Sequence, residues 1–184
     1  MLMTNKTLSS TANLAQLLPT GTVLAFEALS SSFTDNGVCY TSNKFLTALL
    51  IYFCLLSCVF FSFTDSLVGQ DGKHYYGLAT FKGFYVFNFS GTDEEAARIF
   101  HDLRRLRIRI VDFVHAIFTS FVFLVVAFSD TGVQRCFFPS ADSNVKELFV
   151  NLPMGAAFLA SFVFIIFPTT RKGIGYTNGT KQQS

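Results

Sequence analysis

The chain has 184 residues, enough for one compact unit, and 51% of them are hydrophobic while only 14% are charged. Soluble domains carry about 25% charged residues, so this composition excludes an ordinary soluble domain and favours a membrane protein. The net charge of +2, with no basic stripe or nucleic-acid motif, excludes a nucleic-acid-binding protein.

Four segments have the length of a membrane span, about 20 mostly apolar residues. They cover residues 12–31, 45–63, 110–128 and 148–167. The second segment holds no charged residue, whereas the first is the weakest because it contains Pro19 and Glu27. We therefore predict an all-α membrane protein, with a single domain built as a four-transmembrane-helix bundle.

The distribution of Lys and Arg predicts how this bundle is oriented. The linkers after the first and third segments hold only Lys44, Arg135 and Lys146, and the other eleven basic residues lie in the N-terminus, the middle loop and the tail. Cytosolic loops carry the excess of Lys and Arg, so we expect the middle loop (64–107) and both termini in the cytosol.

The middle loop is expected to hold a β-hairpin followed by a helix. Residues 74–89 are rich in aromatic and β-branched residues and are interrupted at Lys82-Gly83, which predicts a hairpin. Its aromatic side chains would lie against the lipid headgroups or form a small core. Thr92 with Glu95 three positions later predicts a capping box, and we expect the helix that it opens to run straight into the third span.

Four arginines precede or begin the third span: Arg104, Arg105, Arg107 and Arg109. They would lie at the level of the cytosolic headgroups, where each basic residue gains about 1 kcal/mol from anionic lipids. They predict either an ordinary cytosolic anchor or specific contact with anionic lipids.

The four cysteines form two pairs with different expected roles. Cys39 and Cys136 fall in the two linkers on the non-cytosolic side, where disulfides persist, so we predict a bond that clamps these linkers together. Cys54 and Cys58 lie one helical turn apart inside the second span, and they are expected to behave as small hydrophobic residues.

Asp112 and His115 form an intramembrane polar pair, three positions apart on one helix face. Ionisable residues in a span are functional candidates, and a carboxylate beside a histidine suits a proton relay. The alternative is a shallow pair that hydrogen-bonds a neighbouring helix or the hairpin loop. The pair lies only about 4.5 and 9 Å beyond Arg109 at 1.5 Å per residue, which favours this alternative.

Prolines and small residues shape the first and fourth spans. Pro19 and Pro153 predict helix kinks. Gly155, Ala156 and Ala160 predict close helix packing, within the bundle or between copies of the chain. With no zinc spacing, phosphate-binding glycine loop or nucleophile elbow, the sequence indicates neither an enzyme nor a cofactor.

Several stretches closely resemble the plant DUF-domain membrane proteins, the DMP family. They are LLPTGT (17–22), FTDNGVC (33–39), FTDS (63–66), DGKHYYGLAT (71–80), DFVHA (112–116), CFFP (136–139) and FPTTRKGIGY (167–176). The similarity runs in order from about Thr7 to Tyr176. It implies four spans with cytosolic termini, residence in the endoplasmic reticulum, vacuolar membrane or plasma membrane, and no established enzymatic activity.

The resemblance further implies a role in endomembrane organisation and remodelling, by fission or fusion, in senescence, programmed cell death or gamete fusion. Our leading hypothesis is therefore a non-enzymatic membrane-shaping protein whose partner is the bilayer, including anionic lipids. A second hypothesis is a proton- or ion-coupled carrier or channel for small solutes that uses Asp112 and His115 and requires a homo-oligomer. A third is a scaffold whose cytosolic loop recruits partners.

Overall fold

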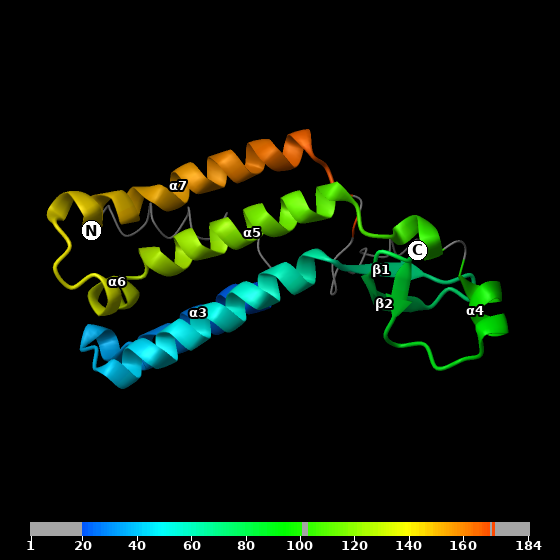
Figure 1. Ribbon diagram of the computed structural model, residues 1–184, viewed down its shortest axis with the longest axis horizontal. Coiled ribbons are helices and arrows are strands. Elements are labelled where there is room, and N and C mark those ends of the chain that lie inside the picture. Colours follow the sequence, from blue (N-terminus) through cyan, green and yellow to red (C-terminus); the bar gives the residue numbers. More distant parts are fainter. Residues whose placement is uncertain (1–19, 101–102, 170, 172–184) are drawn as a thin grey trace, which may run out of the picture.

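The computed structural model describes residues 20–100, 103–169 and 171. Long helices occupy one part of the molecule and a small sheet lies beyond one end of them (Figure 1). In chain order, the described elements are α2 (Thr20–Phe33), η1 (Asp35–Gly37), α3 (Thr41–Ser62), β1 (Thr64–Val68), β2 (His74–Ala79), β3 (Phe84–Val86), α4 (Asp93–Ile99), η2 (Leu103–Leu106), α5 (Ile110–Ser129), α6 (Thr131–Phe137) and α7 (Ser143–Ile166). We call the end with the strands the sheet end, and the end with η1 and α6 the disulfide end.

Three of the described helical stretches are long and apolar enough to cross a membrane. They are α3, the stretch Leu103–Ser129 that contains α5, and α7, and they match the second, third and fourth predicted spans. α7 begins at Ser143, earlier than the expected residue 148. α2 has 14 residues and covers the later part of the predicted first span, whose residues 12–19 lie outside the described chain. The fourth crossing therefore stays a prediction.

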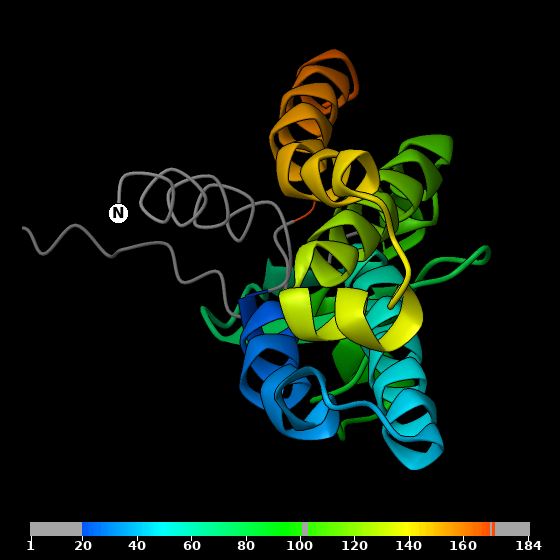
Figure 2. The same cartoon turned by 90° about the vertical axis from the view of Figure 1, so that its left-hand side faces the viewer.

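α5 is the central helix of the bundle. It packs against α3 on one side and α7 on the other, and α2 packs against α3. Seen from the disulfide end, α7 lies apart from α2 and α3 (Figure 2). The core includes Phe26 of α2 and Phe123 of α5, whose rings meet edge to face at 5.6 Å. Because α5 has neighbours on two sides, it is the most buried of the three candidate spans.

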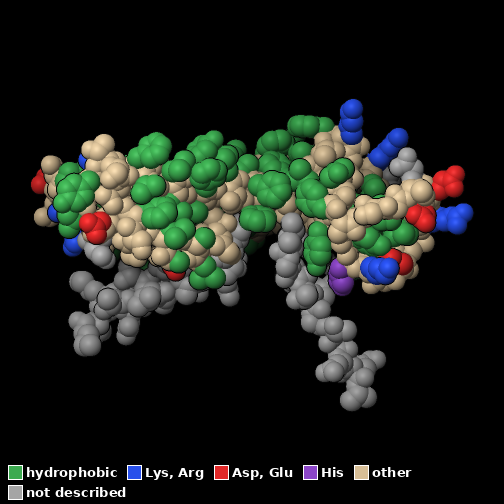
Figure 3. Space-filling view, turned by 90° about the horizontal axis from the view of Figure 1, so that it is seen from below, with side chains coloured by type: hydrophobic (Ala, Val, Ile, Leu, Met, Phe, Trp, Pro, Cys, Tyr) green, Lys and Arg blue, Asp and Glu red, His purple; other side chains and the backbone are tan. Residues whose placement is uncertain are grey.

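The outward faces of the long helices are strongly apolar. Phe45, Ile117, Phe158 and Ile165 are each at least 66% exposed. Hydrophobic side chains cover the helices in Figure 3, whereas most of the charged ones gather at the two ends of the molecule. Soluble monomers rarely expose apolar surface this extensively, so the outer face is suited to lipid.

A disulfide between Cys39 and Cys136 joins the linker before α3 to α6, as predicted. Their Cα atoms lie 5.0 Å apart. η1 packs against α6 beside this bond. The absence of a side chain at Gly37 allows η1 to lie close to Arg135 of α6. The φ of Gly37 is 93°, and a Cβ there would lie only 2.6 Å from Cδ of Arg135. Backbone in this left-handed region favours glycine.

The sheet is an antiparallel meander in the order β1-β2-β3. The predicted hairpin is confirmed, since β2 and β3 pair across the turn at residues 80–83. β1 was not predicted, and the molecule is therefore mainly helical and not purely α. Of the two roles expected for the loop's aromatic residues, the small core is confirmed, and contact with lipid headgroups stays a prediction. Tyr75, Phe89 and Phe100 form a small core with ring centroids 4.8 to 6.2 Å apart, whereas Phe81 is 78% exposed.

The capping box at Thr92 is confirmed, but the helix that it opens does not continue into the third span. Glu95 donates its backbone N–H to the Thr92 side chain, and α4 then ends at Ile99. Phe100 is extended, with its ring buried against Tyr75, and the Ile99 carbonyl accepts a bond from Gln70. These contacts with the sheet turn the chain away from the helical path, so the prediction of one continuous helix was wrong.

Candidate functional site: a charged junction at the sheet end

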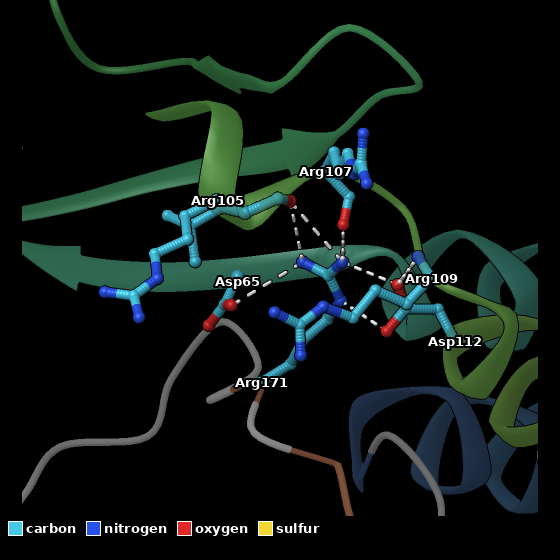
Figure 4. Close-up of a pocket in the computed structure, with 7 residues that line it drawn as sticks. Asp65, Arg105, Arg107, Arg109, Asp112 and Arg171 are labelled. Carbon is cyan, nitrogen blue, oxygen red and sulfur yellow. Dashed lines mark hydrogen bonds and ion pairs between the residues drawn. The ribbon is translucent and has the colours of Figure 1, made fainter. Parts of the chain in front are cut away.

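A cluster of charged side chains lies where the helices meet the sheet. β1 begins immediately after α3 and contributes Asp65, while the first turn of α5 contributes Asp112. Arg171, which follows α7, places its guanidinium group between them (Figure 4). Three chain segments far apart in sequence therefore converge at this junction.

Arg171 binds both carboxylates and two backbone carbonyls. Its Nε and Nη2 donate to the two oxygens of Asp112, both at 2.6 Å, and Nη1 lies 3.6 Å from Asp65. Nη2 also donates to the Arg107 carbonyl at 3.1 Å, and both terminal nitrogens reach the Leu106 carbonyl. A planar guanidinium suits this forked geometry. The three charged side chains are only 5 to 8% exposed, so each depends on its partners.

Asp112 has a second role at the start of α5. Its Oδ2 accepts the backbone N–H of Arg109 at 2.7 Å, which satisfies a donor at the helix N-terminus. The positive end of the helix dipole also favours a carboxylate at this position. Asp112 thus fixes the beginning of α5 and the segment after α7 at once.

His115 lies one turn further along α5 and also contacts the end of α7. Its Nε2 lies 2.6 Å from the carbonyl oxygen of Phe167, and its ring stacks on Phe164 with the centroids 4.4 Å apart. The Phe167 carbonyl belongs to the residue that ends α7, where intrahelical donors run out. The structure therefore joins Asp112 and His115 to the residues after α7 by hydrogen bonds, and a proton-relay role for them stays a prediction.

Three of the four predicted arginines line a cavity next to this cluster. The cavity measures about 130 Å³ and is lined by Asp65, Arg105, Leu106, Arg107, Arg109, Asp112 and Arg171. Arg104 is exposed as well, but it lies outside the lining. The side chains of Arg105 and Arg107 extend away from the buried Arg171 (Figure 4). Contact of these arginines with lipid stays a prediction.

The turn between β2 and β3 lies level with the ends of the spanning helices. Thr80 accepts a bond from the N–H of Ile108, two residues before α5, and Ala79 donates to the carbonyl of Phe63 at the end of α3. Phe81 and Ile110, at this same level, are 78% and 83% exposed. An exposed aromatic side chain therefore lies at the boundary where apolar helix surface begins.

The predicted packing residues of α7 divide into two groups. Ala156 and Ala160 are buried in the helix that packs on α5, so this part of the seam packs within the bundle. Pro153 is buried inside α7, which runs through it from Ser143 to Ile166, and its predicted kink stays a prediction. Gly155 is exposed, and a Cβ at this position would meet nothing within 4 Å. Pro19 lies outside the described residues.

Asp65 and Arg171 were not predicted as site residues, although their place within the stretches that resemble the family could have indicated them. Both lie within stretches that carry the family resemblance, at 63–66 and 167–176, as Asp112 does at 112–116. Neither residue is inside a predicted span, so the rule for intramembrane charges does not select them. Among the described residues, no three His, Cys, Asp or Glu side chains are grouped in a way that could hold a metal ion.

Comparison with known proteins identifies the family. The family model described as Protein of unknown function (DUF679) matches residues 9–176. Protein DMP6 of Arabidopsis thaliana is 44% identical over 96% of this chain and 80% of its own length. Protein DMP5 is 42% identical over 94% and 77%, and Protein DMP10 is 41% identical over 94% and 96%, both from the same plant. No solved structure matches the chain. With the family model covering most of its length and these relatives above 40% identity, the chain belongs to the DUF679 family of membrane proteins.

Proposed function

We propose that this protein is a non-enzymatic, multi-pass protein that reshapes membranes of the plant endomembrane system. The family model itself is described only as a protein of unknown function. The proposal rests on the resemblance to the DMP family, which implies fission and fusion in senescence, programmed cell death and gamete fusion. The proposed membrane is that of the endoplasmic reticulum, the vacuole or the cell surface. In the proposed topology, four segments span it, and the sheet end and both termini face the cytosol.

One observation carries the proposal: the turn at residues 80–83, which holds the exposed side chain of Phe81, lies level with the ends of the long apolar helices. Phe81 is 78% exposed, and hydrogen bonds join Thr80 to Ile108, two residues before α5, and Ala79 to Phe63, the residue after α3. Burial of a Phe side chain contributes about 1.5–3 kcal/mol. Insertion of Phe81 among the headgroups would therefore be favourable and would expand the cytosolic leaflet relative to the other.

The asymmetry of the two ends supports the same conclusion. The sheet end carries the sheet, α4 and an exposed arginine cluster, whereas the described part of the disulfide end consists of η1 and α6 with their linkers. A molecule that is wider at one leaflet than at the other favours a curved bilayer.

Purified protein reconstituted into liposomes tests the proposal. We expect tubules or small vesicles by electron cryo-microscopy as the protein density rises, and a weaker effect for Phe81→Ser. Val68→Ser is the matched control, because Val68 is an exposed apolar residue on the same sheet, at the end of β1 that is farther from α3. Liposomes that keep their shape at high density of wild-type protein would refute the proposal.

A further inference from the structure

Arginines dominate the lining of the cavity at the sheet end. Arg105, Arg107, Arg109 and Arg171 line it together with two carboxylates, those of Asp65 and Asp112. Arg171 binds both carboxylates from its buried position. The lining residues thus comprise four arginines and two carboxylates, a net excess of two positive charges, and the arginines other than Arg171 are exposed.

The cavity mouth has a fixed position relative to the apolar surface. Arg109 immediately precedes α5, and the next residue, Ile110, presents an 83% exposed aliphatic side chain. The Thr80–Ile108 hydrogen bond keeps Phe81 at the same level. In the proposed orientation, the arginines therefore lie where lipid phosphate groups lie, directly above the hydrocarbon.

Arg171 holds in place the chain segment that carries the exposed arginines. It binds the carbonyl oxygens of Leu106 and Arg107, the central residues of the stretch from Arg105 to Arg109. The N–H of Arg109 is bound by Asp112 in the same cluster. The backbone of this stretch is thus anchored, whereas the side chains of Arg105 and Arg107 extend away from Arg171 (Figure 4), so binding of one ligand at the mouth requires both to turn towards it.

We infer that the cavity mouth binds the phosphomonoester headgroup of an anionic lipid, an inference that rests on the proposed function for the placement of this end at the membrane. A phosphomonoester carries about −1.5 to −2 charges at pH 7, which matches the excess of two positive charges. Arginine also binds phosphate in a bidentate manner. A phosphodiester headgroup has one phosphate charge and fewer free oxygens, so it satisfies the site less well. The cavity volume accommodates several water molecules and hence the oxygens of one phosphate group.

Native mass spectrometry of the full chain in detergent micelles tests this inference, with phosphatidic acid, phosphatidylserine and phosphatidylcholine as probes. The test variant is Arg105→Gln/Arg107→Gln/Arg109→Gln. The control variant is Lys73→Gln/Arg98→Gln/Arg104→Gln, which removes three exposed basic residues of the same loop that lie outside the cavity lining. Both variants lose the same charge, so general attraction to anionic lipid affects them equally.

We expect the wild-type protein and the control variant to bind phosphatidic acid at least tenfold more tightly than phosphatidylserine. We expect the test variant to lose this preference. A third variant, Arg105→Lys/Arg107→Lys/Arg109→Lys, should retain part of the affinity, because it keeps the charge but loses the forked geometry.

Three results would overturn the inference. The first is that the test and control variants lose equal affinity for phosphatidic acid. The second is that the wild-type protein binds phosphatidic acid and phosphatidylserine equally tightly. The third is that inorganic phosphate at equal concentration displaces phosphatidic acid. The last result would assign the site to a soluble phosphate. If the protein reshapes liposomes but shows no preference for phosphatidic acid, only this inference fails. If it prefers phosphatidic acid but leaves liposomes unaltered, only the proposed function fails.

Discussion

Arg171 is the residue on which the sheet end depends, because it is the shared partner of two buried acids. Its guanidinium group contacts Asp65 and Asp112 while all three side chains are at most 8% exposed. Buried charges of this kind add little net stability compared with apolar packing, yet removal of one member leaves the others uncompensated. Substitution of any one of these three charged residues should therefore destabilise the junction between the helices and the sheet.

Asp112→Asn should lower the free energy of unfolding by about 3–5 kcal/mol, because Arg171 loses its bidentate partner in a buried site. Thermal unfolding in detergent measures the effect. Asp35→Asn is the control, since Asp35 is exposed at the disulfide end and its φ of 47° suits Asn equally. Unchanged stability of the Asp112 variant together with a loss of proton flux in proteoliposomes would instead favour the relay hypothesis.

The sequence predicted the importance of Asp112 and His115 but not their partners. An ionisable residue inside an apolar segment stands out without any knowledge of the fold. Arg171, which is 59 residues from Asp112 along the chain, lies in a polar stretch where an arginine is unremarkable. Its role arises only when the end of α7 is packed against α5.

Among the secondary-structure elements, the connection between β1 and β2 has its own polar contact. Tyr75 donates its hydroxyl to the Asp71 carboxylate at 2.7 Å. This hydrogen bond lowers the pKa of Asp71 and raises the pKa of Tyr75. The bond requires an ionised Asp71 and a neutral Tyr75, so it is present only over an intermediate range of pH.

The sheet should lose stability at both limits of this range. The stability that ionised Asp71 adds to the folded state is complete above the ordinary pKa of about 4. It is lost as the pH falls through the lowered pKa of Asp71 in the folded state. The contribution of Tyr75 is complete below about pH 10 and is lost as the pH rises through its raised value. Tyr75→Phe should return the pKa of Asp71 towards normal, as NMR titration of the carboxyl carbon would show. An Asp71 pKa that stays low in this variant would contradict the assignment.

Elements with strong local patterns were predictable, and the others depended on distant contacts. The predicted hairpin and the capping box of α4 rely on nearby residues, and both are present. β1 has only five residues and no alternating pattern, and it forms because β2 lies beside it. The break after α4 reflects the burial of Phe100 against Tyr75, a contact that helix propensity cannot anticipate.

At the scale of the whole molecule, the two ends are closed by different chemistry. A disulfide joins segments at the disulfide end, and an ion cluster joins segments at the sheet end. The three candidate spans and the disulfide were predictable from hydropathy and cysteine placement, whereas the cytosolic side of the middle loop, inferred from charge, stays a prediction. The order in which α7, α5 and α3 lie side by side was not predictable, because it depends on which apolar faces fit one another.

Reduction of the Cys39–Cys136 bond should lower the free energy of unfolding by about 4 kcal/mol, since the bond closes a loop with a sequence separation of 97. Cys39→Ser/Cys136→Ser should show a lowered melting temperature that no longer responds to reductant. Cys54→Ala is the control, because that thiol is free and buried, and its variant should respond to reductant as the wild type does. If reductant leaves the wild-type melting temperature unchanged, the bond does not stabilise the bundle.

The position of Arg171 has a consequence for how the chain is assembled during synthesis. Asp65 and Asp112 leave the ribosome 106 and 59 residues before Arg171, as the numbering shows. At a synthesis rate of about 5–20 residues per second, Arg171 is added roughly 5–20 s after Asp65. A nascent chain halted between Asp112 and Arg171 carries both acids without the guanidinium group that they share in the folded protein. The ion cluster at the sheet end can therefore form only after residue 171 has been synthesised. A chain that terminates earlier would lack Arg171, and protein quality control could recognise the incomplete cluster.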